Sequence, residues 1–186
     1  LGGAPQEFTL IYHGNYGSSI LEEGATLHAA AEKVAPMNEH AGEAIGSWTR
    51  YQGPTQDFIE EVFCIEPKAD GNGRTLAVLT NKAGNLATSV TWNRKQLPYL
   101  TVWKNTASEA DGYVTGIEPG TGYPYNRSVE RATGRLPSLR PGQTRKFRLD
   151  FGIHQGKGAV ARMVEKVKNL QGDEAPEVTT DIPNGE

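Results

Sequence analysis

The fold of this chain is decided by the stretch WKNTASEADGYVTGIEPGTGYPYNR, which runs from Trp103 to Arg127. It predicts the end of one β-strand, Pro98–Asn105, then a loop and a second strand, Gly112–Glu118. Because side chains alternate along a strand, Gly116 and Glu118 share one face of the second strand. A glycine inside a strand weakens it and often marks the close approach of a ligand or another backbone. The pattern therefore indicates a site beside Glu118, and a β-bulge next to an exposed strand-end charge is the alternative.

Short segments separated by Gly, Pro and Asn surround this pair of strands, which is typical of a β-sandwich. Further strands are predicted at Glu7–His13, Phe58–Ile65, Arg74–Thr80, Leu86–Trp92, Gly134–Leu139 and Thr144–His154, with a strand or short helix at Ala25–Val34. Helical spacing over Ala159–Leu170 predicts an amphipathic helix that docks on a sheet. The long connection Met37–Gln56 is either the rim of a site or an excursion packed by its own tryptophan and tyrosine. We therefore expect an all-β fold, an antiparallel β-sandwich with a C-terminal helix, over residues 1–171, and a loose tail over residues 172–186.

Two adjacent acids, Glu60 and Glu61, interrupt the predicted apolar strand. They point to opposite faces of that strand. A carboxylate on a covered face is costly unless it is paired, hydrogen-bonded or exposed to a cavity. At least one of the two acids is therefore expected to have a purpose, unless the strand lies at an edge that leaves one acid in water.

The composition is that of a single globular domain, with 186 residues, 37% hydrophobic and 22% charged. The net charge of −3 comes from interspersed acids and bases, so neither nucleic acid nor a membrane surface is an expected partner. No apolar stretch is long enough for a spanning helix and no signal segment is recognised, so the cytoplasm is slightly favoured as the compartment. The lone Cys64 lies in an apolar run and is expected to be a buried thiol. The four histidines form no paired ligand motif, so neither a metal nor another cofactor is expected.

The remaining chemistry consists of a histidine at the end of a predicted strand, carboxylates in apolar strands, and an aromatic rim. An aromatic face packs against a sugar ring while charged groups bind its hydroxyls, so this set suits acid/base work on a polyhydroxylated ligand. A serine nucleophile has no support because the G-x-S-x-G turn is missing from the sequence. Gly156–Gly158 resembles part of a phosphate-binding loop, but the simple start of a helix explains it better.

Four segments carry a family resemblance, and in chain order they are LIYHGNYG, FIEEVFCI, QLPYLTVWKNT and DGYVTGIEPGTGYPYNRSVER. They resemble the C-terminal part of the galactose mutarotase-like (aldose 1-epimerase-like) proteins, and specifically the DUF4432 branch. The resemblance extends from Glu7 to Leu170. It implies a large antiparallel β-supersandwich that binds a sugar in a cleft on one sheet. It also implies that this chain is the C-terminal portion, whose partner is the missing N-terminal portion or a second chain.

The resemblance also implies roles for particular residues. His13 is similar to the acid that protonates the ring oxygen, and Glu118 to the base that takes the proton of the anomeric hydroxyl. Glu60 resembles a sugar-binding aspartate, with Glu in place of Asp, while Trp103 and Lys104 belong to the branch motif as cleft residues. Further substrate contacts are expected from the turn that follows, at Tyr123, Asn126 and Arg127.

Two functions from different classes follow from these features. The first is a carbohydrate mutarotase or epimerase, an isomerase that opens the ring of an aldose by acid/base catalysis without a cofactor. The second is a non-catalytic carbohydrate-binding or sensing protein that keeps the aromatic and arginine contacts. A sugar phosphate is a variant of the first reading, since Arg127, Arg131 and Arg135 could form a phosphate site, although surface charges around a turn explain them as well.

Overall fold

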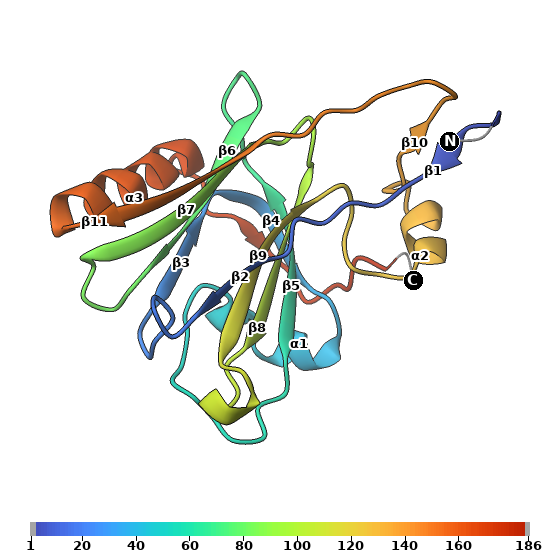
Figure 1. Cartoon of the computed structure of the whole chain (residues 1–186). Coiled ribbons are helices and arrows are strands. Elements are labelled where there is room, and N and C mark those ends of the chain that lie inside the picture. Colours follow the sequence, from blue (N-terminus) through green and yellow to red (C-terminus); the bar gives the residue numbers. More distant parts are fainter. Residues whose placement is uncertain (1–2, 185–186) are drawn as a thin grey trace.

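The computed structural model describes residues 3–184, which form two main β-sheets and three helices (Figure 1). The six-stranded sheet has the order β12-β4-β5-β8-β9-β2, the four-stranded sheet has the order β11-β7-β6-β3, and β1 pairs with β10. The strands are β1 (Gln6–Glu7), β2 (Gly14–Gly17), β3 (Thr26–Ala29), β4 (Ala31–Pro36), β5 (Glu61–Pro67), β6 (Arg74–Thr80), β7 (Leu86–Asn93), β8 (Tyr99–Asn105), β9 (Val114–Gly120), β10 (Ser138–Leu139), β11 (Leu149–Gln155) and β12 (Glu177–Val178). The helices are α1 (Glu39–Glu43), α2 (Arg127–Ala132) and α3 (Lys157–Gln171), with single 3-10 turns at Ile45–Ser47 and Glu109–Asp111. The predicted antiparallel sandwich with a C-terminal helix is confirmed; only β12 runs parallel to its neighbour, β4.

The main hydrophobic core lies between the two sheets. One face of the six-stranded sheet contributes Phe63, Val102 and Ile117, and the four-stranded sheet contributes Leu79 and Trp92. All of these side chains are at most 2% exposed, so the removal of their apolar surface from water stabilises the sandwich. The opposite face of the six-stranded sheet is therefore free to carry other chemistry.

The helix α3 covers the outer face of the four-stranded sheet (Figure 1). Its buried residues Val160 and Val167 pack with Val78 of β6 and Ala87 of β7 in a second, smaller core. The helix extends slightly beyond the predicted range at both ends. Within residues 3–184, no helix is both long and apolar enough to cross a membrane.

The strands β6 to β9 were predicted closely, whereas β5 begins at Glu61 instead of Phe58 and the first strand was placed wrongly. β6 has the predicted bounds, and β7, β8 and β9 differ from prediction by at most two residues at either end. The predicted strand at Glu7–His13 is instead an extended crossing between β1 and β2, tied to β9 by a bridge at Ile11. Gly14 and Gly17 suggested a break, but their backbones pair with β9, and backbone pairing requires no side chain.

The structure also decides the form of three further segments: residues 25–34, the C-terminal tail and the connection after β4. Residues 25–34 hold the strands β3 and β4. The expected loose tail over residues 172–186 is instead docked as far as it is described, since β12 pairs with β4 and Glu177 forms an ion pair with Lys33 at 3.0 Å. The connection Met37–Gln56 combines both expected features, since Trp48 and Tyr51 are buried in the main core while other residues of the segment line two cavities. Cys64 is buried as predicted, and burial raises the pKa of its thiol to about 12.

A buried ion pair fixes the turn after β9, where sequence reasoning missed α2. Glu130 of α2 is fully buried, and Arg135 donates to its Oε1 through Nη2 at 2.7 Å. The backbone N–H of Tyr123 donates to Glu130 Oε2 at 3.0 Å. A Cβ at Gly122 would overlap the same carboxylate oxygen, so only glycine fits there. The turn is thus held by a charge pair far from water.

We predict that Arg135→Met lowers the free energy of unfolding by about 3–5 kcal/mol, because it leaves Glu130 buried and uncompensated. Arg131→Met is the control four residues earlier in the chain, since its ion pair with Glu7 is largely solvent-exposed and its loss should change the stability little. Urea unfolding of both variants measures the difference. Equal losses would show that burial of the Glu130 pair carries no special cost.

Candidate active site

The outer face of the six-stranded sheet carries a cavity of about 450 Å³. Ile117 points into the core, so its neighbours Gly116 and Glu118 point outward into this region. In register, Gly116 lies opposite Trp103 and Glu118 lies opposite Thr101 on β8. The lining residues are Ile11, His13, Met37, Glu60, Val62, Thr101, Trp103, Glu118 and Pro124. Residues from distant parts of the chain therefore meet at one cavity.

His13 and Glu118 form the centre of the cavity. His13 Nε2 lies 2.9 Å from Glu118 Oε1, and the two side chains are 52% and 3% exposed. His13 Nδ1 lies 2.8 Å from Asn15 Oδ1, and because an amide oxygen only accepts, Nδ1 carries a proton. Nε2 is then the nitrogen that faces the carboxylate. The arrangement pairs an accessible imidazole with a buried carboxylate.

Gly116 makes room for this pair. A Cβ at position 116 would overlap Glu118 Oε1, so any larger residue would displace the carboxylate. Gly116 lies between Trp103 on β8 and Asn15 on β2 in the sheet. The glycine in the strand is therefore explained by the space that the Glu118 side chain occupies, whereas the sequence suggested open space for a ligand or another backbone.

The electrostatics of Glu118 are unusual for a carboxylate. Burial raises its pKa above the ordinary value of 4.5, and the nearby His13 acts in the opposite direction. Oε1 is at ion-pair distance from His13, yet no group in residues 3–184 donates a well-aligned hydrogen bond to it. A buried carboxylate oxygen without a donor is costly, so this position is destabilising in the free protein.

The rim is formed by Trp103 and Glu60. Trp103 Nε1 donates to Glu60 Oε2 at 2.7 Å, and the indole meets the His13 ring edge to face at 5.5 Å between centroids. The indole therefore lies directly beside the pair of His13 and Glu118. An indole next to a carboxylate is a suitable surface for a ring that carries hydroxyl groups.

Thr101 is a cavity residue that the sequence analysis did not identify. It is 1% exposed, and its hydroxyl has no hydrogen-bond partner within residues 3–184. Alternation from Trp103 places Thr101 on the same face, so the period of two contained the signal. The pairing of Thr101 with Glu118 depends on register and could be read only from the structure.

Four expected site residues lie away from this cavity. Lys104 follows Trp103 and so points to the opposite face, where it is buried and lines a different cavity, because adjacent residues of a strand do not share a face. Tyr123 is buried against Tyr99, with 4.8 Å between ring centroids. Asn126 precedes α2, and Arg127 donates to the Glu7 carbonyl at 3.3 Å. These last three residues do not line the cavity.

The arginines considered for a phosphate site are engaged elsewhere. Arg127 and Arg131 bind Glu7, and Arg135 binds Glu130. They therefore form no free cationic cluster at the cavity. Within the described part of the chain, no group of three or more His, Cys, Asp or Glu residues is arranged to hold a metal ion.

Two solved structures are similar to this chain. The first is a protein of Klebsiella pneumoniae, provisionally assigned as an aldose 1-epimerase, with a TM-score of 0.95 and 41% sequence identity over 97% of this chain. The second is the Slr1438 protein of Synechocystis, with a TM-score of 0.55 and 18% identity over 83% of this chain, which supports the fold alone. This chain spans 47% of each of those chains, about half of their length. No curated protein matches it.

The sequence model of one family, described as "Domain of unknown function (DUF4432)", matches residues 1–153. The match covers most of the 186 residues, and the similarity to the Klebsiella protein agrees with an aldose epimerase, galactose mutarotase-like fold. The chain therefore belongs to the DUF4432 family.

Proposed function

We propose that this chain carries the acid/base pair of an aldose mutarotase, which exchanges the two anomers of a sugar. The observation that carries the proposal is the 2.9 Å contact between the accessible His13 and the buried Glu118 in a cavity walled by an indole. The provisional assignment of the Klebsiella protein supports the same reaction class.

The geometry suits ring opening because the two reacting oxygens are bonded to the same carbon. Glu118 removes the proton of the anomeric hydroxyl. The electron pair of the broken O–H bond then forms the C1=O bond, and the bond from C1 to the ring oxygen breaks. His13 gives its Nε2 proton to the departing ring oxygen. Rotation about C1–C2 and closure with the roles reversed give the other anomer. Because the anomeric oxygen and the ring oxygen lie close together, His13 and Glu118 can reach both from one side of the sugar. The sugar ring therefore does not have to fit between the two side chains.

The other cavity residues bind the ring in this proposal. Trp103 offers a flat aromatic face, and Glu60 accepts hydrogen bonds from hydroxyl groups beside it. Within residues 3–184 no group donates a well-aligned hydrogen bond to Glu118 Oε1, which contacts only His13, and the Thr101 hydroxyl has no hydrogen-bond partner; sugar hydroxyls could pair with both groups.

We predict that Glu118→Gln and His13→Gln each slow the enzyme-catalysed exchange of anomers by about 10²–10⁴-fold, because each removes one proton-transfer group. Magnetisation-transfer NMR on a panel of aldoses measures the exchange rate at equilibrium. Glu66→Gln is the control, since Glu66 is a half-buried carboxylate of β5 outside the cavity. Unchanged exchange in Glu118→Gln would exclude Glu118 as the base.

A pH titration tests the environment of Glu118 independently of turnover. We expect its carboxyl ¹³C signal to titrate with a midpoint above 4.5, and His13→Gln to move the midpoint higher still by removing a nearby positive charge. Between pH 4.5 and that midpoint the folded state binds more protons than the unfolded state, so the contribution of Glu118 to stability falls as pH rises. Under the proposed mechanism the acid limb of kcat/KM follows the same midpoint. A midpoint at or below 4.5 contradicts the desolvated position.

A non-catalytic carbohydrate-binding protein is the second candidate. The observation that favours it is the direct contact of His13 with Glu118, which occupies both groups in the free protein. Sugar-dependent changes in Trp103 fluorescence without anomer exchange across the panel would support binding alone.

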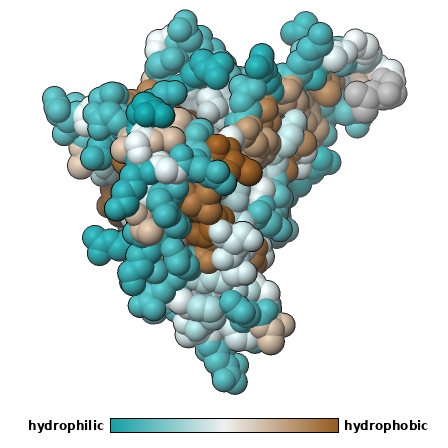
Figure 2. Space-filling model, turned by 60° about the vertical axis from the view of Figure 1, so that its left-hand side comes forward, coloured by the Kyte–Doolittle hydropathy of each residue, from teal (hydrophilic) through white to brown (hydrophobic). Residues whose placement is uncertain are grey.

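We also propose that β11 is the docking edge for the part of a longer DUF4432 protein that this chain does not match. β11 ends the order of its sheet, and its inner-facing Phe151 and Ile153 are 60% and 78% exposed. Figure 2, turned to bring this side forward, shows hydrophobic side chains exposed between hydrophilic ones. An open strand edge with apolar side chains pairs readily with another strand. The Klebsiella protein has an unmatched portion large enough to supply it.

We predict that this chain co-purifies one-to-one with the unmatched portion of the Klebsiella protein when the two are co-expressed. Ile153→Lys should abolish the complex by placing a charge on the apolar edge. Val178→Lys, at an exposed residue of β12 on the other sheet, is the control. Self-association of this chain alone would assign the edge to a second copy. The proposal would be overturned if the two portions did not associate, or if Ile153→Lys left the complex intact.

A further inference from the structure

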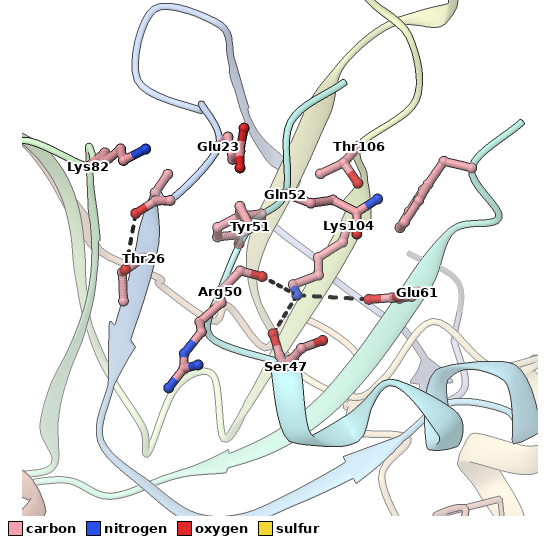
Figure 3. A pocket seen from close by; sticks show the side chains of 13 residues that line it. Glu23, Thr26, Ser47, Arg50, Tyr51, Gln52, Glu61, Lys82, Lys104 and Thr106 are labelled. Atoms are coloured by element: carbon pink, nitrogen blue, oxygen red, sulfur yellow. Dashed lines mark hydrogen bonds and ion pairs between the residues drawn. The ribbon is translucent and has the colours of Figure 1, made fainter. Parts of the chain in front are cut away.

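A second cavity, of about 410 Å³, lies on the opposite side of β8 from the candidate active site. Trp103 points toward the first cavity and Lys104 toward the second, because they are adjacent residues of one strand. Figure 3 shows Lys104 extending between the Ser47–Arg50 turn and Glu61, with Gln52 and Thr106 beside it. The two cavities share no lining residue.

Lys104 is buried, and its hydrogen bonds are incomplete. It is 3% exposed, and its ammonium donates to the carbonyls of Ser47 and Arg50 at 2.6 Å each. An ammonium has three N–H donors, and within residues 3–184 the remaining one has no acceptor at hydrogen-bond distance. Glu61 Oε2 lies 3.8 Å away, which is an ion-pair distance but too long for a hydrogen bond. The two carbonyl acceptors explain why a lysine is present at this position. They do not explain why the third N–H of its ammonium has no acceptor among the described residues.

Thr106 supplies a second unpartnered group at the same cavity. It is 1% exposed, and its hydroxyl has no hydrogen-bond partner within the described residues. Buried hydroxyls are normally paired, since an unpaired one costs about 1–3 kcal/mol. One N–H of the Lys104 ammonium and the Thr106 hydroxyl therefore both lack a hydrogen-bond partner among the described residues at this cavity.

The charges around the cavity favour a neutral ligand. Burial raises the pKa of Glu61 and lowers the pKa of Lys104 to about 8, so each charge is already poorly solvated. Charges of both signs line the cavity, so an anion would meet Glu23 and Glu61, and a cation would meet Arg50, Lys82 and Lys104. A hydroxyl group can accept from the third N–H of Lys104 and donate to Glu61 at the same time. Tyr51 and Phe58 add aromatic surface to the lining.

We propose that the cavity around Lys104, Glu61 and Thr106 is a second binding site, which takes a neutral polyhydroxylated small molecule such as an alditol or a sugar. One hydroxyl of the ligand bridges Lys104 and Glu61, and a neighbouring hydroxyl pairs with Thr106. The aromatic residues contact the carbon side of the ligand. This site is separate from the His13–Glu118 pair and does not require the proposed reaction.

Sorbitol is the probe, because it carries hydroxyl groups but has no anomeric centre. In ¹H–¹⁵N NMR spectra we expect millimolar sorbitol to shift the backbone amides of residues 47–52 and 104–106. The amides of residues 116–118 report separately on the first cavity. Sorbitol shifts confined to residues 116–118, or no shifts at all, would overturn the proposal.

The decisive variant is Thr106→Val, which replaces an unpartnered hydroxyl with a methyl group of similar size. The folded protein loses no hydrogen bond, so the variant should fold at least as stably as the wild type. We expect its Kd for sorbitol, measured from the shifts of residues 47–52, to rise about five-fold through loss of one hydrogen bond to the ligand. Thr106→Ser should restore the affinity.

Thr75→Val is the matched control. Thr75 also carries a buried hydroxyl without a partner among the described residues, but it lies on β6 and does not line this cavity. Its sorbitol affinity should equal that of the wild type. Equal affinities of Thr106→Val and the wild type would overturn the proposed contact, and an equal loss in both variants would assign the effect to general packing.

Discussion

Side chains of β8 and β9 alternate between the two faces of the six-stranded sheet, and the arrangement of the candidate site depends on this alternation. Ile117 is 1% exposed in the core between the sheets, and this anchors Glu118 on the opposite face, although Glu118 is itself only 3% exposed. A shift in register by one residue would bring the carboxylate into the core and Ile117 out of it, and the loss of buried apolar surface opposes such a shift. The core side of the strand therefore fixes the position of the chemistry on its other side.

The same alternation shows which parts of the site could be predicted from sequence. It placed Gly116 beside Glu118, and the structure explains that glycine by the space the carboxylate fills. It also separates Glu60 from Glu61 and Trp103 from Lys104, and each member of these pairs lines a different cavity. The placement of Lys104 in the sugar cleft came from the motif resemblance and ignored the period of two. The place of His13 at a strand end made it a candidate, but its pairing with Glu118 came from the resemblance, since nothing local indicates that it meets a residue on β9.

What the sequence did not reveal depends on contacts between distant segments. Gly14 and Gly17 appeared to be strand breakers, yet β9 supplies the backbone partners that make this segment a strand. The acidic tail has low intrinsic order, but pairing with β4 and the contact of Glu177 with Lys33 give it a place. The helix α2 is short and weak by propensity, and the buried Glu130–Arg135 pair stabilises the turn that contains it. Thr101 became visible only when the register placed it opposite Glu118.

Features that lower the stability of the folded protein are distributed unevenly between the two faces of the six-stranded sheet. Its core-facing side is conventional over most of its area, with closely packed Phe63, Val102 and Ile117. Its outer side carries a glycine inside a strand, a desolvated carboxylate and an unpaired threonine hydroxyl, each of which weakens the free protein. Packing alone does not favour such a combination, and natural sequences tend to depart from local rules where a site requires it. Among the described residues, the core-facing side departs from the same rules only at its end, where Lys104, Glu61 and Thr106 line the second cavity. Because the departures on both sides gather at cavities, binding or catalysis there accounts for them better than chance defects spread over a sheet would.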